Sequence, residues 1–280
     1  MSNRGWWMFV AFAAAPVLAP AQWLNHPTPG IPRTADGKPN LSAPAPRASD
    51  GKPDLSGLWQ TEGAPPEILA RLLPGGNGGG EDSPSQYFLN IFADFKPGEE
   101  PILPAAAAAL RERAKNPVAF TQQSPLSHCL PEGMPLVEIA PAPYKIMQTP
   151  GMTAMLYERD TTFRQVYTDG RNLPADPQPS WLGYSVGKWD GDTLVVDTVG
   201  FNDRGWLDAR GHSHSESLRL TERFHRSDVG HMEVQMTIDD PKTYSKPFMI
   251  KLKQRLLPDT DLLESFCSEN ERDMRHIEAK

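Results

Sequence analysis

The sequence predicts a mainly β protein, in which an antiparallel up-and-down β-barrel is wrapped by an irregular N-terminal half with one or two short helices. Three observations predict this class. Apolar and polar side chains alternate with a period of two over residues 146–270, which is typical of half-buried strands. Turn sequences such as Asp169-Gly170 and Asp240-Pro241 separate these runs. The 280 residues include 29 prolines and 22 glycines, which favours turns over long helices.

About eight or nine strands are expected in this region. A series of hairpins of that length usually closes, since closure removes the two exposed edges of the sheet. A barrel is therefore the first prediction, and a sandwich is the alternative. One apolar line per strand is expected to face the interior: Met152, Ala154 and Leu156; Leu182, Tyr184 and Val186; Leu194 and Val196; Leu218, Leu220 and Phe224; Met232, Val234, Met236 and Ile238; Phe248, Ile250, Leu252 and Leu256; and finally Leu262 and Phe266.

Residues 1–21 have the features of a signal peptide. Arg4 supplies a positive charge, an apolar stretch of 13 residues runs from Trp6 to Leu18, and Ala19-Pro20-Ala21 offers a cleavage site. We therefore expect an exported protein, periplasmic or extracellular. The sequence contains no run of the roughly 18 apolar residues that a membrane-spanning helix requires.

A short duplication lies in residues 22–56. The segment Pro32–Ser42 recurs 14 residues later as Pro46–Ser56. Each copy holds Asp-Gly followed by Lys-Pro, which favours a turn and then extended backbone. We expect these residues to form an extended N-terminal arm that carries the same turn twice.

Residues 57–145 are expected to be an irregular covering segment. Helices are predicted at Pro66–Leu73 and at the alanine-rich Ala105–Lys115, which Asn116-Pro117 ends. Residues 146–270 would form the barrel, and residues 271–280 a C-terminal tail.

The charge and the cysteine content indicate which partners and which cross-link to expect. The chain has 28 Lys and Arg against 35 Asp and Glu, a net charge of −7, so we expect no nucleic-acid partner. Its two cysteines, Cys129 and Cys267, favour a disulfide in an exported protein. A loop of 138 residues (267 − 129) closed in this way would contribute about 5 kcal/mol through chain entropy.

Several longer strings carry a resemblance. Gly57-Leu58-Trp59 is similar to the G-x-W that opens lipocalin barrels. The strings DGKPDLSGLW, CLPEGMP, YKIMQTPG, LGYSVGKWDGDTLVVDTVGFND, GHSHSE and TIDDPKTYSKP resemble an uncharacterised family of exported proteins from soil bacteria, notably acidobacteria. This resemblance implies export and a β-barrel, and it implies no reaction and no catalytic residue.

Three glutamates occupy the expected inward positions of their strands: Glu158, Glu222 and Glu264. A carboxylate in an apolar lining is costly unless it is paired or protonated, so such groups could act as general acid and base or hold a cation. The alternative is that bulges shift the register of these strands, or that Arg164 and Arg223 pair with the glutamates structurally.

The loop over residues 200–216 is long for a hairpin and forms the second candidate region. His212 and His214 share a face if the loop is extended, and Asp203, Asp208 or Glu216 could complete a divalent-metal site for zinc or iron. The alternative is a loop that closes one barrel end with hydrogen-bonded histidines.

Three functions stay open at this point. The first is a binder of a small, largely apolar or aromatic molecule inside the barrel, with candidate contacts at Glu158, Arg164, Tyr184, Trp206 and Arg223. The second is a small barrel enzyme, an isomerase, lyase or hydrolase, with Glu222, Glu264, His212 and His214 as its catalytic residues. The third is an envelope interaction protein with a filled barrel. The sequence leaves the ligand, the metal and the oligomeric state open.

Overall fold

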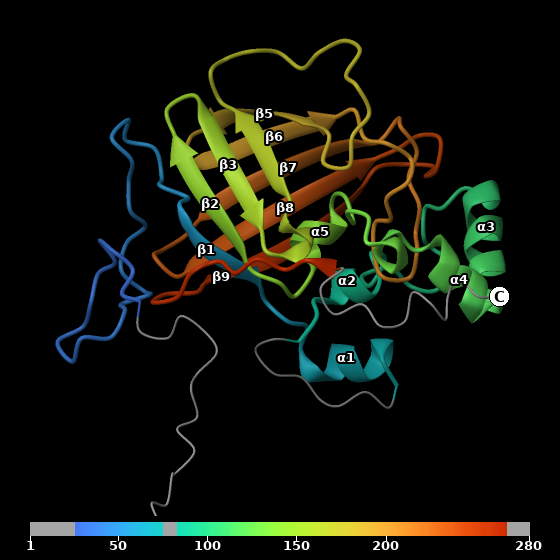
Figure 1. The fold of residues 1–280 in the computed structure, drawn as a ribbon, viewed down its shortest axis with the longest axis horizontal. Coiled ribbons are helices and arrows are strands. Elements are labelled where there is room, and N and C mark those ends of the chain that lie inside the picture. Colours follow the sequence, from blue (N-terminus) through green and yellow to red (C-terminus); the bar gives the residue numbers. More distant parts are fainter. Residues whose placement is uncertain (1–25, 75–82, 268–280) are drawn as a thin grey trace, which may run out of the picture.

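A computed structural model of the chain describes residues 26–74 and 83–267. Within these residues nine strands close into one barrel, with β9 returning to pair with β1 (Figure 1). The strands are β1 (Gly57–Thr61), β2 (Tyr144–Thr149), β3 (Met152–Tyr157), β4 (Phe163–Tyr167), β5 (Tyr184–Asp190), β6 (Thr193–Val199), β7 (Arg219–Arg226), β8 (His231–Asp239) and β9 (Phe248–Leu256). The helices are α1 (Pro66–Leu72), α2 (Gln86–Leu89), α3 (Pro104–Lys115), α4 (Pro117–Gln123) and α5 (Leu136–Ile139), with 3₁₀ turns η1 (Pro125–His128) and η2 (Arg159–Thr161).

The expectation of a purely antiparallel, up-and-down barrel is wrong at one strand pair. β4 and β5 run parallel, joined through Val166 opposite Ser185 and Tyr167 opposite Val186. A hairpin needs only two to five residues, whereas residues 168–183 form a proline-containing connection long enough to return the chain to the same end of the barrel. The barrel is therefore mixed. It also includes β1, from the segment that we expected to be irregular cover.

The inward faces follow the predicted alternation in β6 to β9 and differ from it elsewhere. In β3 the buried residues are Thr153, Met155 and Tyr157, the opposite set to the predicted one. Both faces of this strand carry apolar residues, so alternation alone does not identify the inner face. The last predicted strand is absent from the described residues, because the chain leaves the barrel after Leu256 and runs as an irregular segment to Cys267.

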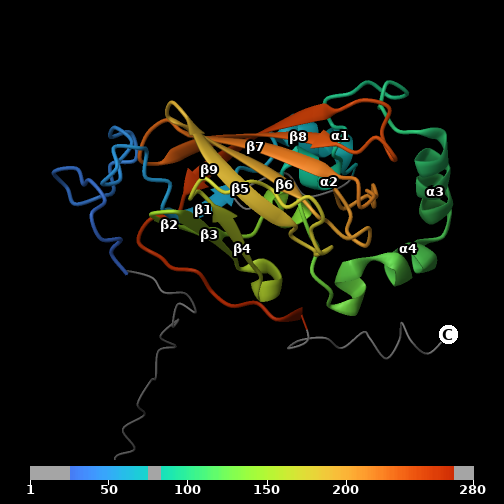
Figure 2. The ribbon, with the colours of Figure 1, turned by 90° about the horizontal axis from the view of Figure 1, so that it is seen from above.

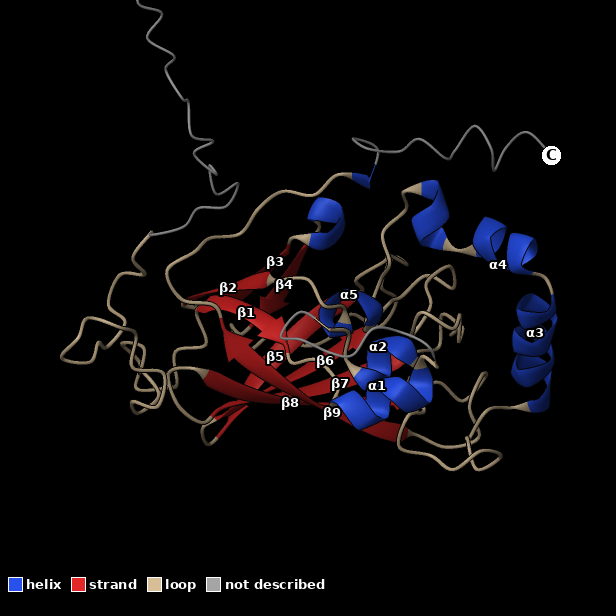
Figure 3. Ribbon diagram, turned by 90° about the horizontal axis from the view of Figure 1, so that it is seen from below, coloured by secondary structure: helices blue, strands red, loops and turns tan. Residues whose placement is uncertain are grey.

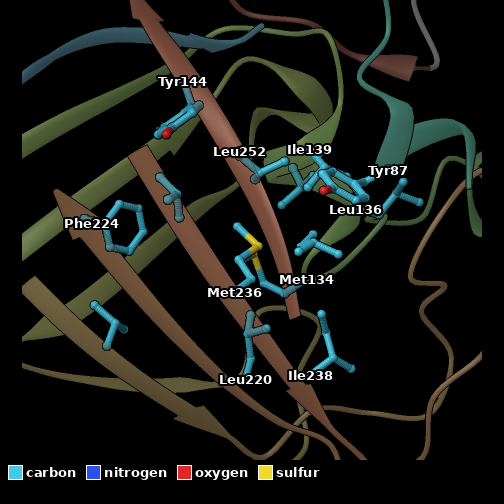
Figure 4. Packing of buried hydrophobic residues seen from close by; sticks show 14 of the residues in the cluster. Tyr87, Met134, Leu136, Ile139, Tyr144, Leu220, Phe224, Met236, Ile238 and Leu252 are labelled. Atoms are coloured by element: carbon cyan, nitrogen blue, oxygen red, sulfur yellow. The ribbon is translucent and has the colours of Figure 1, made fainter. Parts of the chain in front are cut away.

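Side chains fill the barrel lumen. The short helix α5 is buried at all four positions and closes one end of the barrel. Figure 4 shows Leu136 and Ile139 of α5, and Met134 just before it, packed near barrel residues such as Met236 and Leu252. The lumen is therefore a packed core, unlike the hollow lipocalin-like barrel that the first functional hypothesis required.

The opposite end of the barrel is closed by the N-terminal arm. Arg226 at the end of β7 donates to the carbonyls of Asp54 (2.6 Å) and Ser56 (3.2 Å), and its guanidinium lies 4.9 Å from the centre of the Trp59 ring. Leu55 between them is fully buried. Figures 1 and 2 show the arm at this end and α3 and α4 at the other.

The duplication in the arm forms the same turn twice, as predicted. Arg33 bridges Pro39 in the first copy, and Arg47 bridges Pro53 in the second. In each copy the arginine also donates to the carbonyl of the turn glycine, Gly37 or Gly51. Each arginine then forms an ion pair with an aspartate of a barrel turn: Arg33 with Asp259 (2.5 Å) and Arg47 with Asp192 (2.7 Å).

The disulfide and two of the helices agree with the sequence analysis, which predicted one or two short helices, whereas the described residues hold five. α1 and α3 occupy the predicted segments. Figure 3 shows the helices gathered beside the strands at the end of the barrel that α5 closes, which we call the plugged end. Cys129 and Cys267 are bonded, with Cα atoms 5.4 Å apart. Among the described residues, none of the helices has the length and apolar character to cross a membrane. The predicted signal peptide (residues 1–21) and the predicted C-terminal tail (residues 271–280) lie outside the described residues.

Candidate functional site

A pocket of about 640 Å³ lies beyond the plugged end of the barrel, beneath α3. We call it the α3 pocket. It is mainly apolar, with a few polar and charged groups at its wall. Its lining comprises Asn90, Phe92, Glu100, Ile102, Ala107, Leu110, Arg111, Ala114, Phe120, Ala209, Arg210 and His212.

Helix α3 forms one wall of this pocket in an unusual way. None of its twelve residues is buried. Yet Ala107, Leu110, Arg111 and Ala114 share one face at helical spacing, and all four line the pocket. A mostly apolar helix face normally packs against a core, whereas this one borders a space with room for a small molecule.

His212 and Asp208 form a hydrogen-bonded pair at the wall of the α3 pocket. His212 Nδ1 donates to Asp208 Oδ2 over 2.6 Å, so the Nε2 atom is available to the pocket that this side chain lines. Asp208 is fully buried, and its carboxylate also accepts from the backbone N–H groups of Ile91, Arg210 and His212 at 2.7–3.2 Å. These four donors compensate for the burial of its charge and fix the imidazole orientation.

The local sequence explains how the loop makes this pair. Asp208 accepts from the Arg210 N–H two residues on, which is an Asx turn, and Gly211 adopts a φ of +82° that favours glycine. The chain thereby folds back, and Leu207 N–H donates to the His212 carbonyl over 2.7 Å. Arg113 of α3 donates to the Gly211 carbonyl, so the loop and helix are tied together beside the pocket.

The structure separates the histidines that were predicted to share a metal. His214 Nδ1 contacts the Ser215 carbonyl at 3.2 Å, its ring meets the Phe201 ring edge-on, and burial lowers its pKa. Asp203 is exposed in a different part of the loop. Among the described residues, no three His, Cys, Asp or Glu side chains are grouped in a way that could hold a metal ion. Both loop histidines are hydrogen-bonded, as the alternative given above expected.

Glu222 is an inward residue, as predicted, and it is paired in the barrel core. Arg164 Nη1 donates to Glu222 Oε1 over 3.0 Å, and Nη2 bonds the second carboxylate oxygen. Arg164 also donates to the hydroxyls of Ser185 (2.9 Å) and Thr198 (2.7 Å). Both members of the pair are buried, so this arrangement matches the structural alternative for Glu222.

Sequence reasoning missed a second core carboxylate, Glu138, which α5 carries into the barrel. Its Oε2 accepts from Tyr157 (3.2 Å) and lies 3.6 Å from Arg164 Nη1. Burial, followed by the nearby charge of Glu222, raises the pKa of Glu138 to about 8. Its Oε1 and the Tyr144 hydroxyl are both buried, and neither has a hydrogen-bond partner among the residues that the structure describes. One signal was present in the sequence, a lone glutamate within the apolar run Leu136–Ile139.

The remaining predicted site residues do not line the α3 pocket. Arg223 points outward from β7 and pairs with Asp190 (2.8 Å), because its neighbour Glu222 takes the inner face. Glu264 is exposed on the segment after β9, since no strand forms there, and Glu158 follows β3 half-buried.

The two predicted aromatic contacts also lie outside this pocket. Trp206 is buried beside it, where its ring packs 5.0 Å from that of Phe120 and 5.7 Å from the Arg113 guanidinium. Tyr184 stacks on Tyr167, with ring centres 5.3 Å apart, in a surface cleft between β4 and β5. The structure therefore brings together two pairs from the predicted set, Asp208 with His212 at the pocket and Arg164 with Glu222 in the barrel core, and distributes the others.

Comparison with known proteins adds no further constraint on this site. No protein-family model, curated protein or solved structure matches the chain. The geometry of the α3 pocket is accordingly the basis for the functional conclusion below.

Proposed function

We propose that the protein binds a small, largely apolar molecule in the α3 pocket. The observation that carries this proposal is the apolar face of α3, which borders a pocket of about 640 Å³. Small-molecule sites typically occupy 300–1,000 Å³, roughly, and combine an apolar lining with a few fixed polar groups. His212 would supply one such group, because its partner Asp208 fixes the ring and leaves Nε2 toward the ligand.

This proposal moves the binding site from the lumen to the plugged end. The filled lumen argues against a ligand inside the barrel and is the feature that the interaction-protein hypothesis required. The α3 pocket, in contrast, is accessible from outside the barrel core. We further propose that binding takes place outside the cytoplasm, and the Cys129–Cys267 disulfide supports an oxidising compartment.

Native mass spectrometry of protein purified from the periplasm of an expression host tests the proposal. Ala107→Phe places a ring in the pocket, while Ala109→Phe is a control on the exposed, opposite face of α3. We expect a bound organic mass on the wild type and the control, and its loss from Ala107→Phe. Equal retention by all three proteins would place the ligand elsewhere, and absence from all three would favour the interaction protein.

A second candidate function is acid–base catalysis on the bound molecule. The specific observation in its favour is the hydrogen bond from His212 Nδ1 to the buried Asp208, the arrangement in which a carboxylate orients a neutral imidazole as a base. His212 Nε2 would then accept a proton from a substrate or a water held in the pocket.

Hydrolysis of p-nitrophenyl butyrate offers a direct test of this second function. His212→Gln should abolish any turnover and Asp208→Asn should lower it about 100-fold or more, with substrate binding retained. His231→Gln is the matched control, because His231 forms a similar pair with Asp228 (2.8 Å) on the exposed surface. Turnover that survives His212→Gln would exclude the pair as its source.

A further inference from the structure

The charged residues of the α3 pocket indicate which chemical class it takes. Two arginines line it from different elements, Arg111 from α3 and Arg210 from the loop that holds His212. Among the described residues, neither guanidinium takes part in an ion pair or a side-chain hydrogen bond. Arginine is well suited to bidentate contact with a carboxylate.

One acidic residue, Glu100, also lines the pocket. Its Oε2 atom already accepts from the Gly98 N–H over 2.7 Å, within its own turn. Leaving His212 aside, the lining residues therefore carry two positive charges and one negative charge, and the carboxylate of Asp208 behind His212 is compensated by its four hydrogen-bond donors. This balance favours an anionic group in a protein whose net charge is −7.

We infer that the α3 pocket binds an apolar molecule that carries a carboxylate, with the acid group at Arg111 and Arg210 and the apolar body along the α3 face. This inference rests on the proposed function and names the ligand class for the same site. Ala107, Leu110 and Ala114 provide the apolar wall, and their small or flexible side chains leave the space open. His212 lines the same space, and its Nε2 atom, which takes no part in the bond to Asp208, would meet a further polar atom of the ligand.

Calorimetric titration with matched acids and amides tests this inference. The probes are hexanoate, octanoate, decanoate and 4-phenylbutyrate, each compared with its primary amide. We expect at least one acid to bind ten times or more as tightly as its amide. Arg111→Gln and Arg210→Gln should each lower the affinity for that acid about fivefold or more and leave the affinity for its amide unchanged. Glu100→Gln should raise the affinity for the acid.

One control variant and two further outcomes distinguish a failure of the carboxylate assignment from a failure of the proposed function. Arg223→Gln, an exposed arginine outside the pocket, should change neither affinity. Amides that bind as tightly as their acids would overturn the carboxylate assignment and leave the proposed function in place. If no acid and no amide bound the wild type, both the assignment and the proposed function would be contradicted.

Discussion

At the scale of single residues, two pairs of buried polar side chains lie in different environments. Asp208 is surrounded by N–H donors and touches a pocket through His212, whereas Arg164 and Glu222 satisfy each other inside a packed barrel. A charge pair in such a core contributes to the fold, while a histidine at a pocket wall is available for a ligand. This contrast is the reason that we assign function to His212 and a structural role to Glu222.

Removing the core cation should be costly. Arg164→Met leaves two buried carboxylates without their partner, and we expect a loss of about 3–5 kcal/mol of unfolding free energy. The double variant Arg164→Met/Glu222→Met, measured at pH 7, should recover most of this loss, because it removes both charges of the ion pair and leaves Glu138, whose pKa is raised to about 8, mainly protonated. Urea denaturation of both variants measures the difference. Equal instability of the single and double variants would contradict the pairing.

Glu138 should make stability depend on pH. Its pKa in the fold is raised to about 8 from 4.5, so the folded state holds a proton that the unfolded chain releases. The stabilising contribution of this proton is complete below about pH 4.5 and is lost as pH rises through about 8, with a limiting slope of about 1.4 kcal/mol per pH unit. Unfolding free energies measured between pH 5 and 9 should therefore show a shallower decline in Glu138→Gln. An identical slope in both proteins would show that Glu138 does not titrate in this range.

At the scale of elements, the barrel is closed by unlike devices at its two ends. Helix α5 inserts apolar side chains and Glu138 at one end, and the arm covers the other through Arg226 and paired turns. Because each turn uses its own arginine and its own barrel aspartate, the two copies of the duplication are independent attachments.

Hydrogen exchange followed by mass spectrometry tests that independence. Asp192→Asn should speed amide exchange in residues 46–56 and leave residues 32–42 unchanged, because it removes the partner of Arg47 alone. Asp259→Asn should have the opposite pattern through Arg33. Faster exchange in both copies with either variant would show that the arm detaches as one unit.

The elements that could be predicted from the sequence are those with a single apolar face. In β6 to β9 one side chain in two is buried, so alternation identified the inward Glu222. In β3 both faces carry apolar residues, and the prediction for Glu158 was wrong by one position of register. The parallel pairing of β4 with β5 depends on where a long connection returns, and local sequence does not encode that path.

The sequence predicted the region of the candidate site but not the pairing of Asp208 with His212. The length of the loop drew attention to residues 200–216, and both Asp208 and His212 were among its candidates. Their pairing requires the Asx turn and the positive φ of Gly211, which together bend an apparently extended segment. The pocket itself needs α3, which lies about 100 residues earlier in the chain and so leaves no local signal.

At the scale of the whole molecule, the disulfide ties the helical cover to the end of the chain. Cys129 follows η1 at the plugged end, and Cys267 ends the segment that runs on from β9. Replacing both by alanine should lower the free energy of unfolding by a few kcal/mol, up to about 5 kcal/mol for a loop of 138 residues. Denaturation of the variant and of the reduced wild type should give the same loss. Unchanged stability in both would show that the bond does not constrain the unfolded chain.

On the proposed function, the arm covers one end of the molecule and the ligand binds at the other. The arm and its two ion pairs lie at one end of the barrel, and the α3 pocket with its Asp208–His212 pair lies beyond the other. The packed lumen between them provides a rigid support for the loop that presents His212.

The most direct test of the α3 pocket is a fluorescence titration with 8-anilinonaphthalene-1-sulfonate, an apolar anion that brightens when it leaves water. We predict saturable binding by the wild type and by Ala109→Phe, and at least tenfold weaker binding by Ala107→Phe. Circular dichroism of the three proteins serves as the control for folding. Equal binding by all three folded proteins, or none by the wild type, would contradict the central claim that this pocket is a ligand site.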